Sequence, residues 1–524
     1  MLAHDAPRAL RRAAWTRFDE PWDMLVIGGG VTGAAILLEA ARRGLRAALL
    51  ERADFASGAS SRSSKLVHGG LRYLRDGKFA LTRESVRERQ ALLRDAPGLV
   101  DPMHFLMPHY RGGKPSPQTL GLGLALYDLF AGHRQHRAID AEEALRLVPA
   151  IDTAGLLGAH DYLDATTDDA RLVLRLIQEA RSAGALALNY VEVRELLQHD
   201  GIVIGARVVD GIENTAGEIR ARVTINAGGS FADSLRVQLG ERAKLRPLRG
   251  SHLILPDWRL PLAQAVAFSH PRDGRPVFAY PWLGITLVGT TDVDHVESRH
   301  GEPSISEPEA TYLLEALAHQ FPSSAVDRAD VIATFAGVRP VIESGRADPS
   351  KEPRDHAILK ERGMLTVTGG KLTTFRPMAM AALHAVADRF DAIDLAPRPA
   401  LTRSTLPHAP HLPLADRLRL SGRYGASAQL LLDETPPSEH CPVDSTPTLW
   451  AELRWAARHE SVEHLDDLLL RRTRLGLIAP TVDLRWAARL RTICTQELLW
   501  DDARFEHEAH AYRALHAAYY GAPA

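Results

Sequence analysis

The sequence predicts an α/β protein: a Rossmann-like dinucleotide-binding domain with an inserted antiparallel-sheet domain, followed by a C-terminal helical domain. Three observations predict this fold class. A glycine-rich βαβ pattern lies near the start, a strand-rich alternating stretch occupies the middle, and a proline-rich segment precedes a helical remainder. A length of 524 residues is too great for one ordinary core and agrees with two or three domains.

The glycine-rich pattern begins with a short apolar run, Met24 to Ile27, which has the length and branching of a buried strand. Gly28, Gly30 and Gly33 follow it at G-x-G-x-x-G spacing. In this motif the first glycine permits a tight turn, the second lets a pyrophosphate approach the backbone, and the third lets a helix pack closely on the sheet. The run and the glycines therefore predict a phosphate-binding turn.

The residues after these glycines complete the βαβ unit. Val31 to Arg43 are helix formers, and Ala47 to Leu50 form a second apolar run. Glu51 ends that run, at the position where a carboxylate can bind a ribose diol. A glycine motif alone is weak, but strand, glycines, helix, strand and acid in this order predict dinucleotide binding.

Further segments favour a flavin over a nicotinamide. Segment 56–70 is rich in small and hydroxyl residues, so it can lie flat against a large planar ligand and donate hydrogen bonds. Met364 to Thr368 predicts a buried strand, and the pair Gly369-Gly370 opens a helix whose N-terminus would stabilise the anion of a reduced flavin. A nicotinamide needs only the first glycine junction. The pair Ala227-Gly228 ends another strand, which either returns beneath the first phosphate loop or forms a purely structural turn.

The middle of the chain, 245–291, alternates apolar and polar residues in strand-length runs, which suits an antiparallel sheet with one face over a cavity. We interpret it as a substrate domain inserted into the nucleotide fold. The predicted boundaries are 1–20 for an N-terminal arm; 21–75, 145–240 and 330–390 for the discontinuous dinucleotide-binding domain; 76–144 and 241–329 for the substrate domain; 391–412 for a linker; and 413–524 for the C-terminal helical domain.

Composition excludes several classes of protein. A formal net charge of −2 and a pI near 6.9 give no bulk electrostatic reason for nucleic-acid binding. Cys441 and Cys494 form no ligand cluster, so no metal is expected, and such sparse cysteine suits a reducing compartment. No apolar run is long enough to span a membrane, and the N-terminus lacks the apolar core of a secretory signal.

Two basic stretches bear on membrane contact. The arm from Arg8 to Phe18 combines arginines with Leu10 and Trp15, which predicts either a short interfacial helix or a solvated arm. The run Arg471 to Arg474 predicts either a solvated helix face or a second contact with anionic lipid.

The segment Ser63 to Leu74, SSKLVHGGLRYL, resembles the signature of FAD-dependent glycerol-3-phosphate dehydrogenases, the membrane-associated, quinone-reducing enzymes of bacteria and mitochondria. The resemblance covers roughly 23–500. Phe375, in place of the family's usual aromatic residue, and Ser230, in place of its usual proline, are departures that remove no required chemical group. Similar segments begin at Pro102, Leu124, Asp161, Asn226, Arg249, Tyr280, Gly337, Thr368 and Leu465.

The resemblance implies FAD as the cofactor. The pair of glycine junctions and Glu51 predicts that it is bound tightly but non-covalently. Together with the glycine junctions, the resemblance places the following residues at FAD: Gly28, Gly30, Gly33, Glu51, Ser63, Ser64, Lys65, Leu66, His68, Gly69, Ala227, Gly228, Gly369, Gly370, Lys371, Leu372 and Thr373.

The resemblance also implies a dianionic glycerol phosphate as substrate, whose site needs fixed cations. Arg339 in GVRP and Arg354 in EPRDH match family positions that hold the phosphate, and the planar guanidinium fork suits that task. Arg72 and Lys371 are further substrate-binding candidates near the flavin. For each arginine the alternative is an ordinary surface salt bridge.

Oxidation at C2 of this substrate requires hydride transfer to the flavin and loss of the C2 hydroxyl proton. His252, on the predicted substrate sheet, is the first candidate for the base, and His68 is the second, with flavin contact as its alternative. A satisfied structural histidine is the competing interpretation of His252. Arg339 could also stabilise the developing alkoxide.

The predicted function is oxidation of sn-glycerol 3-phosphate to dihydroxyacetone phosphate, with electrons passed through FAD to a membrane quinone. The expected partners are glycerol 3-phosphate, quinone and an anionic lipid surface, without nucleic acid, and a homodimer is left open. The expected location is the cytoplasm, at the inner face of the cell membrane. Two alternatives remain: an oxidase that passes electrons to oxygen, and a non-enzymatic flavoprotein with a structural or redox-sensing FAD.

Overall fold

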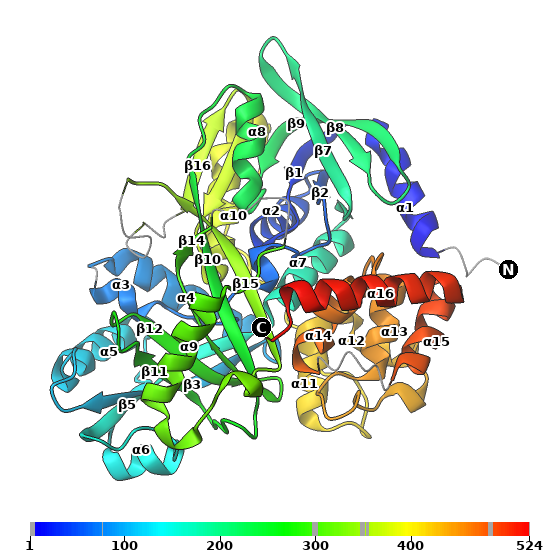
Figure 1. Ribbon diagram of the computed structural model, residues 1–524. Coiled ribbons are helices and arrows are strands. Elements are labelled where there is room, and N and C mark those ends of the chain that lie inside the picture. The colour runs from blue at the N-terminus through cyan, green and yellow to red at the C-terminus, as the bar shows by residue number, and fades with distance from the viewer. Residues whose placement is uncertain are drawn as a thin grey trace.

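The computed structural model describes residues 6–75, 77–295, 302–345, 352, 356–479 and 486–522, without the side chains of 6–10, 72 and 75. Within these ranges the chain forms two β-sheets and a C-terminal group of helices (Figure 1). The next paragraphs take the first sheet, the second sheet and the helices in turn.

The first sheet contains eight described strands and follows the order β16-β17-β9-β1-β2-β6, with β7 and β8 extending β9 as an antiparallel ribbon. The central strand β1 pairs in parallel with β2 on one side and β9 on the other. Its strands are β1 (Trp22–Ile27), β2 (Ala47–Leu50), β6 (Leu186–Leu188), β7 (Val191–His199), β8 (Ile202–Asp210), β9 (Thr215–Asn226), β16 (His356–Glu361) and β17 (Met364–Gly369).

Strand β1 is buried on both faces, which explains its unbroken apolar run. Met24 and Val26 point into a core shared with α2 (Val31–Ala41), α7 (Asp169–Ser182) and α10 (Phe375–Ala385), whereas Leu25 and Ile27 point into a separate core beneath β8 and β9. The predicted βαβ unit is therefore confirmed. The predicted return of a late strand beside β1 is also confirmed, because Ile27 pairs with Asn226 at the end of β9.

The second sheet contains nine described strands and follows the order β14-β10-β13-β12-β11-β3-β5-β4, with β15 paired to β10. Its pairs are antiparallel except for β11 with β3. Its strands are β3 (Val100–Tyr110), β4 (His136–Asp140), β5 (Leu156–Thr167), β10 (Leu245–Pro256), β11 (Ala265–Ser269), β12 (Pro276–Trp282), β13 (Ile285–Gly289), β14 (Val293–Asp294) and β15 (Ala333–Ile342).

Two of these strands differ from the predicted division of the chain. Strands β5 and β15 fall in segments assigned to the dinucleotide-binding domain, 145–240 and 330–390, but both pair within the second sheet. Strand pairing depends on partners far away in the sequence, so the local apolar pattern gave no indication of the sheet that each strand joins. The consequence is that Arg339, in β15, belongs to the second sheet.

The remaining helices surround the two sheets, and the C-terminal helices form a group of their own (Figure 1). This group shares a buried cluster with the second sheet, in which Trp282 and Phe335 meet Leu468 and Trp500. The helices are α1 (Ala6–Thr16), α3 (Leu71–Arg75), α4 (Phe79–Asp95), α5 (Pro117–Ala131), α6 (Ala141–Leu147), α8 (Ala232–Gln238), α9 (Glu307–Gln320), α11 (Leu414–Tyr424), α12 (Ala428–Asp433), α13 (Trp450–His459), α14 (Leu475–Ile478), α15 (Ala487–Leu498) and α16 (Asp502–Tyr519).

One face of the N-terminal arm packs against the first sheet, so the arm is not a freely solvated one, although Arg12 is exposed. The side chains of Arg8 and Leu10 lie outside the described part of the structure. Arg11 in α1 is buried and donates to both carboxylate oxygens of Asp210 at 2.7 Å. The rings of Trp15 and Phe18 lie 4.6 Å apart and pack against the core beneath β8 and β9. Among the described residues, no helix combines the length and the apolar character that crossing a bilayer requires.

Candidate active site

A large cavity of about 2430 Å³ is lined by both sheets and by the loops between them. It exceeds the roughly 300–1,000 Å³ of an ordinary small-molecule site, so it has room for a dinucleotide and a small substrate together. The predicted site residues that line it are Gly28, Gly30, Glu51, Ser63, Ser64, Leu66, His68, Ala227, Gly228, Arg339, Gly369, Gly370, Lys371, Leu372 and Thr373.

The glycine turn after β1 has the geometry of a phosphate cradle. Gly28 has a φ of 114°, and a Cβ there would lie 2.5 Å from the carbonyl oxygen of Ala227. Gly33 does not line the cavity. A Cβ there would lie 1.9 Å from the carbonyl oxygen of Gly28, so the helix packs directly on the turn. Gly33 performs the packing role that the motif assigns to the third glycine. Gly30 precedes α2 and faces the cavity, so the N-terminus of α2 is open to a pyrophosphate.

Glu51 lies beside this turn, at the end of β2. Its carboxylate accepts hydrogen bonds from the backbone N–H groups of Gly29 at 2.6 Å and Ala53 at 2.9 Å. Burial raises the pKa of Glu51, and the two N–H donors oppose that rise. The carboxylate is thus fixed at the cavity wall, where the two hydroxyls of a ribose can reach it.

The loop 56–70 runs along the cavity, and buried carboxylates behind it hold it in place. Asp169 accepts hydrogen bonds from Ser63 N at 2.9 Å and Ser63 Oγ at 2.7 Å, and pairs with Lys65 Nζ at 3.0 Å. Asp164 accepts a hydrogen bond from Gly69 N at 3.2 Å. Lys65 and Gly69 are not among the residues that line the cavity, and these contacts anchor the loop. Their contact with the cofactor stays a prediction.

The basic run at 471–474 supplies more of this anchorage. Arg472 donates to Asp54 Oδ1 at 2.7 Å, and Arg474 donates to Asp168 Oδ1 at 2.9 Å and also pairs with Asp169. The three arginines of the run are almost fully buried, so the expectation of a solvated face or a lipid contact is wrong. The carboxylate partners of Arg472 and Arg474 lie far away in the sequence, which is why the run looked like an exposed stripe.

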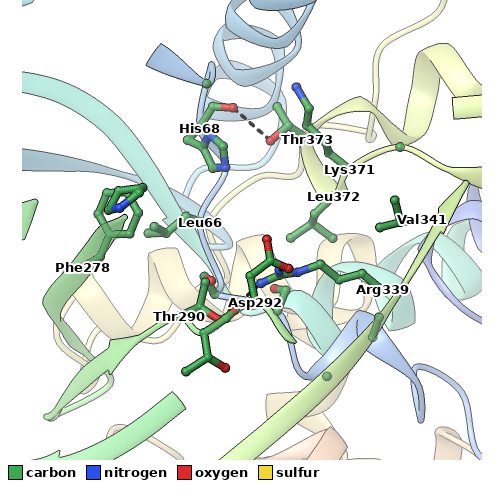
Figure 2. Close-up of a pocket in the computed structure, with 18 of the residues that line it drawn as sticks. Leu66, His68, Phe278, Thr290, Asp292, Arg339, Val341, Lys371, Leu372 and Thr373 are labelled. Carbon is green, nitrogen blue, oxygen red and sulfur yellow. Dashed lines mark hydrogen bonds and ion pairs between the residues drawn. The ribbon is translucent and has the colours of Figure 1, made fainter. Parts of the chain in front are cut away.

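The second glycine junction also lines the cavity and contacts loop 56–70. After β17, Gly369 and Gly370 lead into a short 3₁₀ turn (Leu372–Thr374), and Thr373 Oγ1 donates to the carbonyl oxygen of His68 at 3.3 Å. Lys371 Nζ lies 3.6 Å from the centre of the Tyr73 ring and donates to Ser85 Oγ at 3.3 Å. Figure 2 shows His68, Leu372 and Thr373 gathered on this side of the cavity.

Arg339 extends from β15 to the cavity wall, where Asp292 and Thr290 orient it (Figure 2). Its Nη1 donates to Asp292 Oδ1 at 3.0 Å and its Nη2 donates to Thr290 Oγ1 at 3.2 Å. A Cβ at Gly250 would lie 2.4 Å from Nη2, so this glycine leaves space for the guanidinium. Sequence analysis did not single out Asp292, although it stands in the GTTDVDH segment on which the family resemblance drew.

His252 does not line the cavity, which corrects the expectation that it contacts the substrate. Its ring is 1% exposed, stacks on Phe335 with centroids 4.5 Å apart, and has Nε2 2.9 Å from Ser64 Oγ. Burial holds the pKa of His252 well below its usual value, and the nearby cations Lys65 and Arg339 lower it further. Ser64 stands between His252 and the cavity, whereas His68 reaches the cavity directly.

The two remaining substrate candidates cannot be placed by their side chains. Arg72 lies in α3, but its side chain is outside the described part of the structure, and Arg354 lies wholly outside the described residues.

Among the described residues no group of acidic, histidine and cysteine side chains has the arrangement of a metal site.

Comparison with known proteins agrees with this geometry. A family model of FAD dependent oxidoreductases matches residues 23–383, and one of the C-terminal domain of alpha-glycerophosphate oxidase matches residues 383–505. The aerobic glycerol-3-phosphate dehydrogenase of Staphylococcus saprophyticus is 37% identical over 380 residues, which cover 71% of this chain and 68% of that protein. Its counterparts in Staphylococcus aureus are 36% identical over 382 residues, with the same shares.

Solved structures also match this chain. The glycerol-3-phosphate dehydrogenase from Bacillus halodurans, complexed with FAD, matches over 98% of each chain with a TM-score of 0.79 and 27% identity. The L-alpha-glycerophosphate oxidase from Mycoplasma pneumoniae matches over 73% of this chain and 98% of its own, with a TM-score of 0.58 and 18% identity, which shows a shared fold alone.

The fold and the cavity are therefore those of an FAD-dependent oxidoreductase, and the glycine cradle, Glu51 and the second glycine junction are the parts that fit FAD. Within that class, the chain belongs to the family of aerobic glycerol-3-phosphate dehydrogenases.

Proposed function

We propose that this enzyme oxidises sn-glycerol 3-phosphate to dihydroxyacetone phosphate and passes the electrons to a membrane quinone. The observation that carries the proposal is that Arg339, held by Asp292 and Thr290, lines the same cavity as the dinucleotide cradle. A phosphorylated substrate bound there lies next to the cofactor. Family membership supplies the reaction class, and the arginine supplies the phosphate contact.

Arg339 is the proposed phosphate ligand because its guanidinium fork can give two parallel hydrogen bonds to a phosphate. Thr290 and Asp292 fix the plane of the guanidinium before the substrate binds, which reduces the entropy lost on binding. Lys371, which also lines the cavity, adds positive charge to it and favours a dianion.

FAD, when bound, supplies the acceptor for the hydride from C2 of the substrate. The chain must then remove the C2 hydroxyl proton, and we assign this task to His68, which lines the cavity. His252 contributes through Ser64: its Nε2 lies 2.9 Å from Ser64 Oγ and fixes the orientation of that hydroxyl at the cavity wall.

An apolar surface at the cavity supports quinone as the acceptor. Leu122 and Leu129 in α5 are 74% and 72% exposed, Phe79 in α4 is 52% exposed, and all three line the cavity. Exposed apolar side chains beside the exposed Lys114 suit contact with an anionic lipid surface. We therefore replace the N-terminal arm and the 471–474 run with this surface as the proposed site of peripheral membrane association, loosened but not abolished by salt. A homodimer stays a prediction.

The decisive experiment uses purified holoenzyme under anaerobic conditions. Glycerol 3-phosphate should bleach the flavin spectrum, and glycerol, which lacks the phosphate, should not. With air admitted, stoichiometric peroxide would identify an oxidase. Low peroxide, together with quinone reduction stimulated by anionic liposomes, supports the dehydrogenase.

The surface in α5 has its own test. The double variant Leu122→Glu, Leu129→Glu should keep activity with a soluble dye but lose liposome binding and quinone reduction. Leu414→Glu, which changes a leucine that is 64% exposed and does not line the cavity, is the matched control and should retain all three. A double variant that pellets with liposomes like the wild type would remove α5 from the proposal.

A further inference from the structure

The C-terminal end of the chain reaches the back of the cavity wall, and no step proposed above uses it. Tyr520 follows α16 and is 4% exposed. Its hydroxyl accepts hydrogen bonds from Arg62 Nε at 3.0 Å and Nη2 at 2.7 Å, and donates to Glu302 Oε2 at 3.0 Å. Arg62 and Glu302 also form an ion pair, and both line the cavity. The Tyr520 hydroxyl thus uses its donor and both acceptor positions to bind these two residues, which line the cavity.

The backbone at this end holds the strand that carries Arg339. In the described structure, β15 pairs along one side with β10. Near its start, Thr334 N donates to the carbonyl oxygen of Tyr520 at 2.8 Å, and Thr334 Oγ1 donates to that of Gly521 at 2.9 Å. The chain end therefore fixes β15 from the side opposite β10.

A third contact, between Arg62 and Gly337 of β15, joins the hydroxyl contact of Tyr520 to its backbone contact. A Cβ at Gly337 would lie 2.5 Å from the carbonyl oxygen of Arg62 and 3.0 Å from its Cβ, so the Arg62 residue rests directly on β15, close to Arg339. Arg62 also belongs to the loop 56–70 along the cofactor side of the cavity. Loop 56–70, strand β15 and the C-terminal end of the chain therefore meet at Arg62.

We infer that Tyr520 is a positioning residue: its hydroxyl fixes Arg62 and its carbonyl group fixes β15, so that Arg339 is held where it binds the substrate phosphate. Tyr520 does not line the cavity and acts through Arg62 and Thr334. The inference rests on the proposed function, because it names what orients the proposed phosphate ligand. It also gives the C-terminal helical domain a role in substrate affinity.

The test compares Tyr520→Phe with Tyr512→Phe in the holoenzyme. Tyr512 is a buried tyrosine of the same domain, and in the described structure no hydrogen bond joins its hydroxyl to Arg62 or β15. Tyr520→Phe should raise the Kd and KM for glycerol 3-phosphate about 3- to 10-fold, which is the usual effect of losing one net hydrogen bond, while kcat changes less than about twofold. Tyr512→Phe should leave Kd, KM and kcat unchanged, and both variants should retain FAD.

A double-mutant cycle separates positioning from general support of the fold. In an Arg339→Ala background, Tyr520→Phe should change the Kd by less than about twofold, because the group that it positions is gone. If Tyr520→Phe does not yield holoenzyme, Thr334→Val removes the bond to Gly521 and takes its place in the same comparison.

Three results overturn the inference. The first is an unchanged Kd in Tyr520→Phe, and the second is an equal loss of affinity with and without Arg339. The third is a wild-type enzyme whose flavin glycerol 3-phosphate does not bleach. Only the third also overturns the proposed function, so the two failures are distinguishable.

Discussion

Replacing Arg339 by alanine is the sharpest test of the proposed phosphate site. Loss of one charge-assisted hydrogen bond costs roughly 1.5–3 kcal/mol, or about 10- to 150-fold in KM. The side chain is 28% exposed, and solvent screening favours the lower half of that range. Asp292 favours the upper half of that range. In the variant this carboxylate, which is 9% exposed, no longer has Arg339 to offset its charge, so it repels the incoming dianion. We therefore expect the middle of the range, an increase in KM of about 30- to 50-fold.

The assay is the initial rate with a soluble dye acceptor, together with anaerobic bleaching of the flavin by glycerol 3-phosphate. Arg339→Lys keeps the charge but loses the planar fork, so its KM should fall between those of the wild type and Arg339→Ala. The double variant Arg339→Ala, Asp292→Asn should recover part of the affinity, because the repelling carboxylate is gone. A KM for Arg339→Ala equal to that of the wild type refutes the assignment, and no recovery in the double variant refutes the role given to Asp292.

Three further predictions follow from the site. Glu51→Gln should raise the Kd for FAD about tenfold, measured by flavin fluorescence on dilution, because it weakens the acceptor for the ribose diol; a change in KM alone would contradict this. His68→Gln should slow anaerobic flavin reduction by about 10²- to 10⁴-fold and His252→Gln by less, and the reverse order would make His252 the base. Burial would raise the pKa of Asp168, but Arg474 and Arg423 outweigh it and lower that pKa to about 2. The resulting stability, about 3 kcal/mol, is fully present above the unfolded pKa of about 3.9 and is lost as the pH falls toward 2. Asp168→Asn should remove this acid dependence from unfolding curves, and an unchanged curve would contradict it.

Local patterns predicted the parts of the site that are built locally. The strand, the glycine turn and Glu51 are close in sequence, and each glycine's need for space or for a positive φ is a backbone property that the residue type reveals. The same holds for Gly369 and Gly370. The position of His252 could not be predicted in this way, because the face of β10 that becomes buried depends on which strands pair with it.

The anchorage of the cofactor loop lay beyond sequence reasoning for a different reason. Asp54, Asp168 and Asp169 look like ordinary surface acids, and the 471–474 run looks like an ordinary surface stripe. Only the tertiary structure brings these acids and arginines together and removes both kinds of side chain from water. A charged run therefore shows its role only when its partners are known.

The buried arginines behind the cofactor loop also constrain when the enzyme can become active. Asp54, Asp168 and Asp169 are synthesised hundreds of residues before Arg472 and Arg474, and Arg62 long before Tyr520. Until the last part of the polypeptide leaves the ribosome, Asp54 lacks Arg472, and Asp168 and Asp169 lack Arg474, so the loop that faces FAD lacks this part of its support. Cofactor loading is therefore a late event in biosynthesis, and a chain truncated before residue 471 should accumulate without FAD.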